Sequence, residues 1–357
     1  MTHIQGIPDP GPGLRLHLNE NTAGCSPRVV EAISRLSSGD LALYPDYKAA
    51  VLETAAHLGV DPDWVVLTNG LDEGILLASL ACLSPYAANE AVSAAGITGS
   101  RGVPEVVITV PAFEAYAVCA QALGAVVVAV PHEPDFVFPL KGVLSAITPA
   151  TRLIYVNTPH NPSGVPVDAD MVRQVIAHAP QAVVFIDEAY HDFLGETFLA
   201  EVRTFPNVII GRTFSKAYGL AGMRVGVLVA APALLEPIRY VMPVYNLSVV
   251  AVAALRAALT DAAFVPWYVE QVRASKALVY AALDQLGLRY WRSAANFVLI
   301  DGGGQARVLV DELQRRKIFV RDRTADPHCR NCFRLTTGVV EHTRAAIATL
   351  EQLCVGR

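Results

Sequence analysis

Short apolar runs recur along the first two thirds of the chain, separated by longer segments with helical periodicity. The runs are VVLT (65–68), EVVITV (105–110), AVVVAV (125–130), RLIYVN (152–157), AVVFID (182–187), NVIIG (207–211) and VGVLVA (225–230). Several are apolar throughout instead of alternating, which is typical of strands covered on both faces. Strands that alternate with helices predict an α/β domain with a mostly parallel sheet. We expect this domain to span residues 41–255.

The pattern changes after residue 256. A long helical stretch, WYVEQVRASKALVYAALDQLG, precedes two strand-like runs, NFVLI and FRLTT, and a further helical segment, EHTRAAIATLEQLC. This order predicts a smaller α+β domain, formed by residues 256–357 and completed by the N-terminal residues 1–40. The segment from Ser84 to Gly102 is rich in Ala, Gly and Ser, which predicts a loop or an irregular helix.

The composition narrows the class of protein. The 357 residues are 53% hydrophobic and carry a net charge of -5, which suits a large core but neither nucleic acid nor an anionic membrane as partner. No apolar run is long enough for a transmembrane helix, and the first residues lack the features of a secretory signal, so we expect a cytoplasmic protein.

Cys329 and Cys332 have the spacing of a zinc-binding or redox-active pair. No second ligand pair accompanies them, and we therefore expect reduced thiols and no metal site.

Polar residues directly follow five of the predicted strands. They occur in NGLDEGI, PAFEAY, TPHNPSG, DEAYHDF and RTFSKAYG. Ligands of α/β sheets bind beyond the carboxyl ends of the strands. The five stretches therefore predict a ligand site at one edge of the sheet.

Two cations and one carboxylate indicate the chemistry of that site. A lysine beside a dry core, as Lys216 is expected to be, can act as a nucleophile with a lowered pKa. Ser215, Arg224 and the glycine-containing turn TNGLDEG suit a small phosphate, because neither glycine motif of nucleotide-binding proteins is present. Asp187 ends an apolar strand, where a carboxylate is costly unless it meets a cation such as a pyridinium nitrogen. Cofactors that carry an aldehyde and a phosphate need this set of groups.

Three stretches carry a resemblance to a known family. NTPHNPSG (157–164), DEAY (187–190) and TFSKAYGLAGMRVG (213–226) resemble the signature blocks of fold-type-I, pyridoxal-phosphate-dependent aminotransferases. Within that superfamily the chain most resembles the histidinol-phosphate aminotransferase group, and the similarity extends from LNEN (18–21) to FRLTTG (333–338). The resemblance implies the PLP-transferase fold of type I, with a mostly parallel seven-stranded sheet, and pyridoxal 5'-phosphate as cofactor.

The resemblance also implies roles around the cofactor ring. Lys216 resembles the lysine that bonds to the cofactor aldehyde and shuttles the substrate proton. Asp187 looks like the partner of the pyridine nitrogen, and Asn161 and Tyr190 match the donors to the ring oxygen. Phe113, in PAFEAY, occupies the place of the aromatic residue that stacks on the ring.

The cofactor phosphate and the substrate are assigned in the same way. The groups that match the phosphate cradle are Ser215, Arg224 and the backbone of Leu71 and Asp72. Tyr44, in YPD, resembles a tyrosine that reaches the phosphate of the neighbouring subunit, which implies a homodimer. Arg334 looks like the clamp of the substrate carboxylate. Arg321 matches an arginine linked to a substrate phosphate, and Asn21 belongs to the LNEN segment that closes over the substrate.

These residues predict an aminotransferase that moves an amino group between an L-amino compound and 2-oxoglutarate. Histidinol phosphate is the first donor that the resemblance implies, and an aromatic amino acid is the next. One alternative keeps the cofactor but decarboxylates an amino acid, as in threonine-phosphate decarboxylase, although the DEAY and SKAYGLAGMRVG blocks favour transamination. A regulatory ligand-binding module is a second alternative, but the acidic chain lacks a basic DNA-binding extension.

Overall fold

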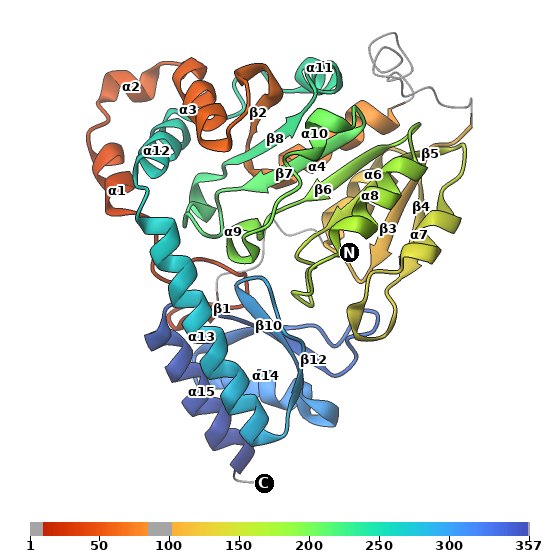
Figure 1. The fold of residues 1–357 in the computed structure, drawn as a ribbon. Helices are drawn as coiled ribbons and strands as arrows, with labels where there is room; N and C mark the ends of the chain where they lie inside the picture. Colours follow the sequence, from red (N-terminus) through yellow and green to blue (C-terminus); the bar gives the residue numbers. More distant parts are fainter. Residues whose placement is uncertain (1–9, 85–101, 356–357) are drawn as a thin grey trace.

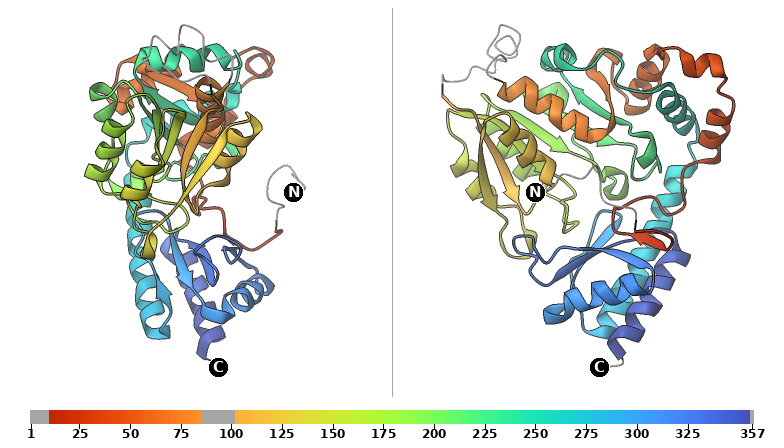
Figure 2. Two further views of the ribbon diagram at one scale, coloured as in Figure 1. Left: turned by 90° about the vertical axis from the view of Figure 1, so that its right-hand side faces the viewer. Right: turned by 180° about the vertical axis from the view of Figure 1, so that it is seen from behind.

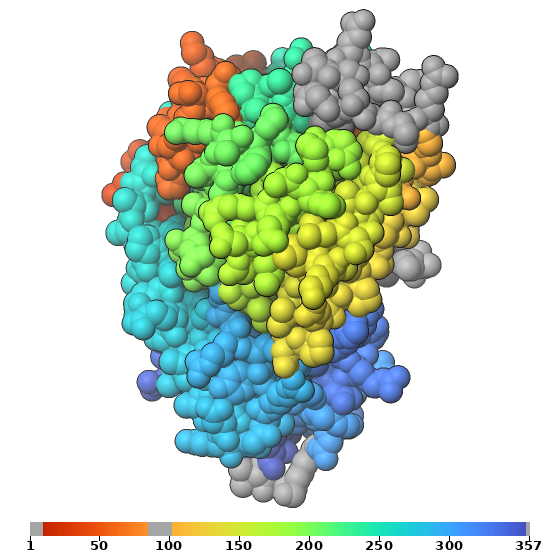
Figure 3. Space-filling view, turned by 45° about the vertical axis from the view of Figure 1, so that its right-hand side comes forward, coloured from red at the N-terminus to blue at the C-terminus, as the bar shows by residue number. Residues whose placement is uncertain are grey.

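The computed structural model describes residues 10–84 and 102–355, which form two bodies, each built around its own sheet (Figure 1). The larger body contains a seven-stranded sheet with the strand order β2-β8-β7-β6-β5-β3-β4. The smaller body contains a five-stranded sheet with the order β1-β11-β12-β10-β9. The views from the side and from behind show the long helix α13 running from the larger body into the smaller one (Figure 2). Figure 3 shows the blue C-terminal body packed directly beneath the yellow and green larger body.

Each of the seven predicted apolar runs forms a strand of the larger sheet. The strands are β2 (Val65–Thr68), β3 (Glu105–Val110), β4 (Val126–Pro131), β5 (Thr151–Asn157), β6 (Val183–Asp187), β7 (Val208–Thr213) and β8 (Gly226–Ala230). Strand β8 pairs antiparallel with both β2 and β7, whereas β3, β4, β5, β6 and β7 pair in parallel. The predicted mostly parallel sheet is confirmed. Its parallel order brings the carboxyl ends of the central strands to one edge.

Successive residues of the central strands pack into separate cores on the two faces of the sheet. On β6, Val184 and Ile186 belong to one hydrophobic cluster, whereas Val183 and Phe185 belong to the other. Because side chains alternate along a strand, an apolar run without alternation is covered on both sides. One face is covered by α4 (Gly70–Leu83), α6 (Glu114–Ala122) and α11 (Pro232–Val241). The other is covered mainly by α3 (Lys48–Leu58), α7 (Leu140–Ala146), α8 (Ala169–His178), α10 (Glu201–Thr204) and α12 (Val249–Thr260).

The smaller sheet has one face covered by helices and one face turned toward the larger body. Its strands are β1 (Leu14–Leu16), β9 (Arg289–Tyr290), β10 (Phe297–Asp301), β11 (Ile318–Asp322) and β12 (Cys332–Thr336). Residues Phe333 and Leu335 pack in the cluster formed with α13 (Phe264–Leu286), α14 (Ala306–Arg315) and α15 (Val340–Val355). Alternation along β12 therefore turns Arg334 away from these helices and toward the larger body.

The N-terminal segment contacts both bodies. Strand β1 pairs in parallel with β11 in the smaller sheet, whereas α1 (Pro27–Ser34), which is followed by α2 (Ser38–Ala42), packs against α12. In the larger body the short helix α9 (His191–Leu194) follows β6 and contacts α13. The domain boundaries at residues 40 and 255 remain a prediction. The segment expected as a loop or an irregular helix, 84–102, lies almost wholly outside the described residues.

Among the described helices none alone is long and apolar enough to span a bilayer, and α12 and α13 would do so only as a pair that is bent by 79°.

Candidate active site

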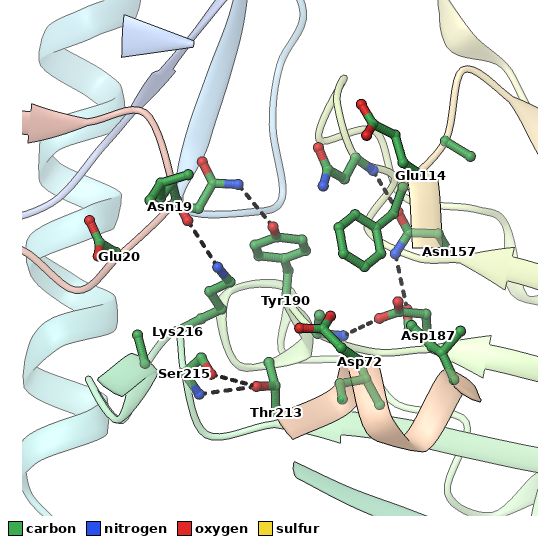
Figure 4. A pocket seen from close by; sticks show the side chains of 18 of the residues that line it. Asn19, Glu20, Asp72, Glu114, Asn157, Asp187, Tyr190, Thr213, Ser215 and Lys216 are labelled. Atoms are coloured by element: carbon green, nitrogen blue, oxygen red, sulfur yellow. Dashed lines mark hydrogen bonds between the residues drawn. The ribbon is translucent and has the colours of Figure 1, made fainter. Parts of the chain in front are cut away.

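A cavity of about 760 Å³ opens between the two bodies, at the carboxyl ends of β5, β6 and β7. Three parts of the chain line it: the strand ends of the larger sheet, the segment after β1, and the arginine-bearing face of the smaller sheet. Figure 4 shows residues of the first two parts, among them Asp187, Lys216 and Asn19. Of the residues predicted for the site, those that line the cavity are Leu71, Asp72, Phe113, Asn161, Asp187, Tyr190, Ser215, Lys216, Arg224, Arg321 and Arg334.

Lys216 extends from the loop after β7 toward the segment after β1 (Figure 4). Its Nζ donates a hydrogen bond to the carbonyl oxygen of Leu18 at 3.0 Å and lies 6.0 Å from the centre of the Tyr190 ring. Burial, reinforced by repulsion from Arg334, lowers the pKa of Lys216 to about 8. A substantial fraction of this amine is therefore neutral, and so nucleophilic, near physiological pH.

Asp187 is the last residue of β6 and is almost completely buried. One carboxylate oxygen, Oδ1, accepts the backbone N–H of Ala189 at 2.9 Å, and the other, Oδ2, accepts the hydroxyl of Tyr116. Burial raises the pKa of Asp187 to about 6, although both donors lower it. The like charges of Asp72 and Glu188 also raise it, and Asp187 forms no ion pair with a cation of the described residues. A carboxyl group without a cation at the base of a cavity is suited to a cationic ligand.

Two asparagine side chains hydrogen-bond to Tyr190 and Asn161, the residues predicted to donate to the oxygen of the cofactor ring. Asn19 Nδ2 donates to the hydroxyl oxygen of Tyr190 at 2.8 Å, and Asn157 Oδ1 accepts the backbone N–H of Asn161 at 2.7 Å. Asn157 also donates to the backbone carbonyl of Asp187 at 3.4 Å. Neither Asn19 nor Asn157 was predicted as a site residue. Asn157 had a signal, since it is the polar residue that ends an apolar strand, whereas the Asn19 contact bridges residues far apart in the sequence.

The start of α4 lies open toward the cavity. Its N-cap residue, Asn69, makes no side-chain cap, so the first N–H groups of the helix have no side-chain acceptor there. A Cβ atom on Gly70, which has φ of +74°, would lie 2.5 Å from Nη2 of Arg224. A Cβ atom on Gly226 would lie 2.6 Å from the carbonyl carbon of Gly70. The absence of side chains at these two positions allows the helix start and the arginine to meet.

Arg224 and Ser215 lie beside this helix start. Arg224 adopts the left-handed backbone conformation, with φ of +52°, and its Nη2 donates to Oδ2 of Asp72 at 2.8 Å. Thr213 Oγ1 donates to Ser215 Oγ at 3.0 Å and accepts the backbone N–H of Ser215 at 3.1 Å. The Ser215 hydroxyl is therefore left with its own proton to donate. A guanidinium, a hydroxyl donor and open helical N–H groups together suit a phosphate.

Three arginines form the opposite wall. Arg334 Nη2 donates to the carbonyl oxygen of His17 at 3.0 Å, Nη1 donates to Oδ1 of Asn161, and buried Nε has no hydrogen-bond partner. Arg321 is the neighbour of Arg334 in the pairing of β11 with β12. Arg323, which was not predicted, also lines the cavity and pairs with Asp326. Burial, together with repulsion from the neighbouring cations Arg323 and Arg321, lowers the pKa of Arg334 to about 10.

Two predicted residues lie away from this cavity. Tyr44 is 74% exposed, and its ring stacks on that of Tyr245 with centroids 4.0 Å apart. Asn21 lines a smaller, adjoining cavity, and its Nδ2 donates to the carbonyl oxygen of Ala217 at 2.9 Å. This bond links the N-terminal segment to the residue that follows Lys216.

Cys329 and Cys332 are buried free thiols, and the described residues contain no cluster of His, Cys, Asp and Glu suited to a metal ion.

A nucleophilic lysine, a buried carboxyl group and a phosphate-type cradle at the mouth of a parallel sheet define an enzyme site. The model of the family described as "Aminotransferase class I and II" matches residues 12–350. The chain is 36% identical over 349 residues to a protein from Ralstonia nicotianae named histidinol-phosphate aminotransferase 2, covering 95% of this chain and 88% of that protein. The protein belongs to the class I and II aminotransferase family.

Two solved structures share the fold. Histidinol-phosphate aminotransferase from Sinorhizobium meliloti, solved in complex with pyridoxal-5'-phosphate, has a TM-score of 0.83 and 26% identity over 96% of this chain and 91% of that one. L-threonine-O-3-phosphate decarboxylase from Porphyromonas gingivalis has a TM-score of 0.79 and 18% identity over 96% of this chain and all of that one, a likeness of fold alone. The predicted fold-type-I, pyridoxal-phosphate-dependent aminotransferase is confirmed, and the decarboxylase alternative is not favoured.

Proposed function

We propose that the protein transfers the amino group of histidinol phosphate to 2-oxoglutarate, with pyridoxal 5'-phosphate held between Lys216 and Asp187. One observation carries this proposal. Lys216 and Asp187 line one side of the cavity, and three arginines line the opposite side. The name of the Ralstonia relative supports the choice of donor.

The residues of the larger body fit the cofactor. Asp187 would face the pyridine nitrogen, because a buried carboxyl group without a cation is stabilised by a protonated ring. Asn161 and Tyr190 would donate to the ring oxygen, and Phe113, which is 38% exposed at the cavity, would pack on the ring face. The phosphate would be held by Ser215, Arg224 and the backbone N–H groups of Leu71 and Asp72.

Lys216 would act as the base. When bound, the cofactor withdraws electrons from the substrate α-carbon and so makes its proton removable. The neutral Nζ of Lys216 takes that proton and returns it, and its lowered pKa keeps both protonation states accessible near neutral pH. The neighbouring carbonyl oxygen of Leu18 holds the amine in place between transfers.

The arginine wall would bind the anionic end of the donor. A phosphate monoester carries up to two negative charges at neutral pH, and three guanidinium groups converge on the cavity from β11, the following loop and β12. Arg334 has a buried Nε without a partner, and Arg323 has another. Unpaired buried donors are costly, and an anion with several oxygens would satisfy them.

We also propose that two copies of the chain form a homodimer in which Tyr44 reaches the partner's cavity. The stacked rings of Tyr44 and Tyr245 bring together two exposed apolar pairs of chain neighbours, Leu43 with Tyr44 and Val244 with Tyr245. A patch of this kind is typical of a protein interface. Sedimentation of the holoenzyme is expected to give a dimer, and Leu43→Asp is expected to shift it to monomer. A monomeric wild-type protein that is fully active would contradict the dimer.

A donor panel tests the function. Purified protein with pyridoxal 5'-phosphate and 2-oxoglutarate should form glutamate from histidinol phosphate faster than from phenylalanine, tyrosine or histidine. The same donors labelled at the carboxyl carbon, where they have one, should release no carbon dioxide. If no donor yields glutamate, the proposed reaction is wrong, and if only phosphate-free donors react, the choice of donor is wrong.

A further inference from the structure

The carboxylate of Asp187 accepts a hydrogen bond from a tyrosine that lies in another element of the fold. Tyr116 lies in α6, on the face of the larger sheet that α4, α6 and α11 cover, and is 1% exposed. Its hydroxyl donates to Oδ2 of Asp187, whereas Oδ1 accepts the backbone N–H of Ala189. Within the described part of the chain, each carboxylate oxygen therefore receives one hydrogen bond. Both donors favour the ionised carboxylate, because a protonated oxygen accepts more weakly.

We propose that Tyr116 is a positioning residue that keeps Asp187 ionised and correctly oriented toward the ring nitrogen of the bound cofactor. This inference rests on the proposed function, because it assigns Asp187 to that nitrogen. Tyr116 itself acts through Asp187 and takes no part in proton transfer at the substrate.

The packing around Tyr116 fixes the direction of its hydroxyl. The ring stacks on Tyr155, with centroids 4.4 Å apart and planes 13° apart, and it meets Phe113 edge-on at 5.8 Å. The Tyr155 hydroxyl is engaged elsewhere, with Ser79 Oγ at 2.9 Å. Two stacked phenols thus point to different partners, and only the Tyr116 hydroxyl bonds to the Asp187 carboxylate.

The surrounding charges explain why such a donor is needed. The titratable groups that interact electrostatically with Asp187 include Asp72 from α4, Glu188, Tyr155 from β5, Tyr190 and Tyr116. The two acidic groups raise its pKa, as burial does, and the hydrogen bond from Tyr116 is the largest opposing effect. Burial and, to a smaller extent, the negative charge of Asp187 raise the pKa of Tyr116 well above its ordinary value. The phenol therefore keeps its proton.

The test compares two variants that each lose one hydroxyl of the stacked pair. Tyr116→Phe removes the bond to Asp187, and Tyr155→Phe is the matched control. Each protein is freed of cofactor, and its affinity for pyridoxal 5'-phosphate is measured by equilibrium dialysis from pH 6.0 to 8.5. Without the Tyr116 hydroxyl the pKa of Asp187 rises, so Tyr116→Phe should bind the cofactor about tenfold more weakly at pH 7 and recover part of that loss at pH 8.5. Tyr155→Phe should follow the wild-type curve.

A double-mutant cycle separates positioning from simple packing. If Tyr116 acts through Asp187, then Tyr116→Phe should change cofactor affinity by less than about twofold in an Asp187→Asn background. Equal losses in both backgrounds, a wild-type pH curve for Tyr116→Phe, or an equal shift in Tyr155→Phe would overturn the inference. A wild-type protein that retains no pyridoxal 5'-phosphate would instead overturn the proposed function, and this inference with it.

Discussion

Two lysines of this protein have the same lowered pKa but lie in different surroundings. Burial lowers the pKa of Lys276 to about 8, as it does that of Lys216. Lys276 lies on α13, donates to the carbonyl oxygen of Ser293 at 2.7 Å and does not line the main cavity. Lys216 also bonds to one carbonyl oxygen, but it opens on a cavity with a buried carboxyl group and three arginines. A lowered pKa alone therefore does not mark a catalytic amine, and the cavity and its charges do.

The largest expected effect is the difference in activity between substitution of Lys216 and substitution of Lys276. Lys216→Ala should lower turnover by roughly 10³-fold or more, because it removes the acid–base group at the substrate. It should also abolish the visible absorbance band of the bound cofactor. Lys276→Ala should keep the band and most of the activity. Steady-state kinetics and spectra of both variants check this, and comparable losses in the two would contradict the distinction.

The arginine wall should affect donors according to their charge. Arg323→Gln should raise the KM for histidinol phosphate about tenfold or more, because a hydrogen bond between charged groups is lost. The KM for a phosphate-free aromatic donor should change by less than about threefold. Initial rates with the two donors give both values from one preparation. A proportional change for both donors would show that Arg323 supports the fold without selecting the donor.

A smaller effect is expected where the backbone of the phosphate region is tightly packed. Gly226→Ala would place a Cβ 2.6 Å from the carbonyl carbon of Gly70 and 2.7 Å from the backbone nitrogen of Leu71. We expect it to lower the free energy of unfolding by about 1–3 kcal/mol and to weaken cofactor binding. Gly304→Ala, for which no atom lies within 4 Å of the added Cβ and which does not line the main cavity, is the control and should change neither. Urea unfolding measures the first quantity and equilibrium dialysis the second; equal behaviour of the two variants would contradict the role of close packing.

The last expected effect, similar in size to that of Gly226→Ala, concerns a buried histidine beside Asn161. His160 Nε2 donates to the carbonyl oxygen of Pro111 at 2.8 Å, so Nδ1 accepts the hydroxyl of Ser163 at 2.7 Å. Burial lowers the pKa of His160 to about 3, so the folded protein keeps the ring neutral while the unfolded chain protonates it below about pH 6.5. Its contribution is present above pH 6.5 and is lost as pH falls, by about 1.4 kcal/mol per pH unit.

His160→Gln should therefore flatten the decline of unfolding free energy between pH 6.5 and pH 5. Urea unfolding across that range measures the slope of both proteins. Asp187, whose pKa is raised to about 6, acts in the opposite direction and is common to both, so the difference between them isolates His160. Identical slopes would contradict a neutral buried ring.

The sequence predicts the elements that depend on local pattern. The apolar runs of the larger sheet are recognisable because they are covered on both faces, and the motifs at their ends carry Lys216, Asp187 and Arg224. The site residues that were missed depend on distant contacts. Tyr116 meets Asp187 across 71 positions of the chain, and Asn19 meets Tyr190 across 171. Such contacts follow from helix rotation and strand register, which no local pattern fixes.

The arginine wall was predicted only in part. Arg334 and Arg321 were predicted from the resemblance, whereas Arg323 lies two residues after Arg321. The pairing of β11 with β12 continues there, because the backbone N–H of Arg323 donates to the carbonyl oxygen of Cys332 at 3.1 Å, and strand alternation then places Arg323 on the same face as Arg321. Tyr44 marks a further limit, since its exposed ring gains its predicted role only from a second copy of the chain.

The most direct measurement locates the cofactor on the chain. Holoenzyme is reduced with borohydride, which fixes the cofactor aldehyde to its amine, and is then digested and analysed by peptide mass spectrometry. The chain has five lysines: Lys48, Lys141, Lys216, Lys276 and Lys317. We predict that the cofactor mass appears on the peptide that contains Lys216 and on no other. Its stoichiometric presence on the Lys276 peptide, or its absence from all five, would contradict the assignment of the site.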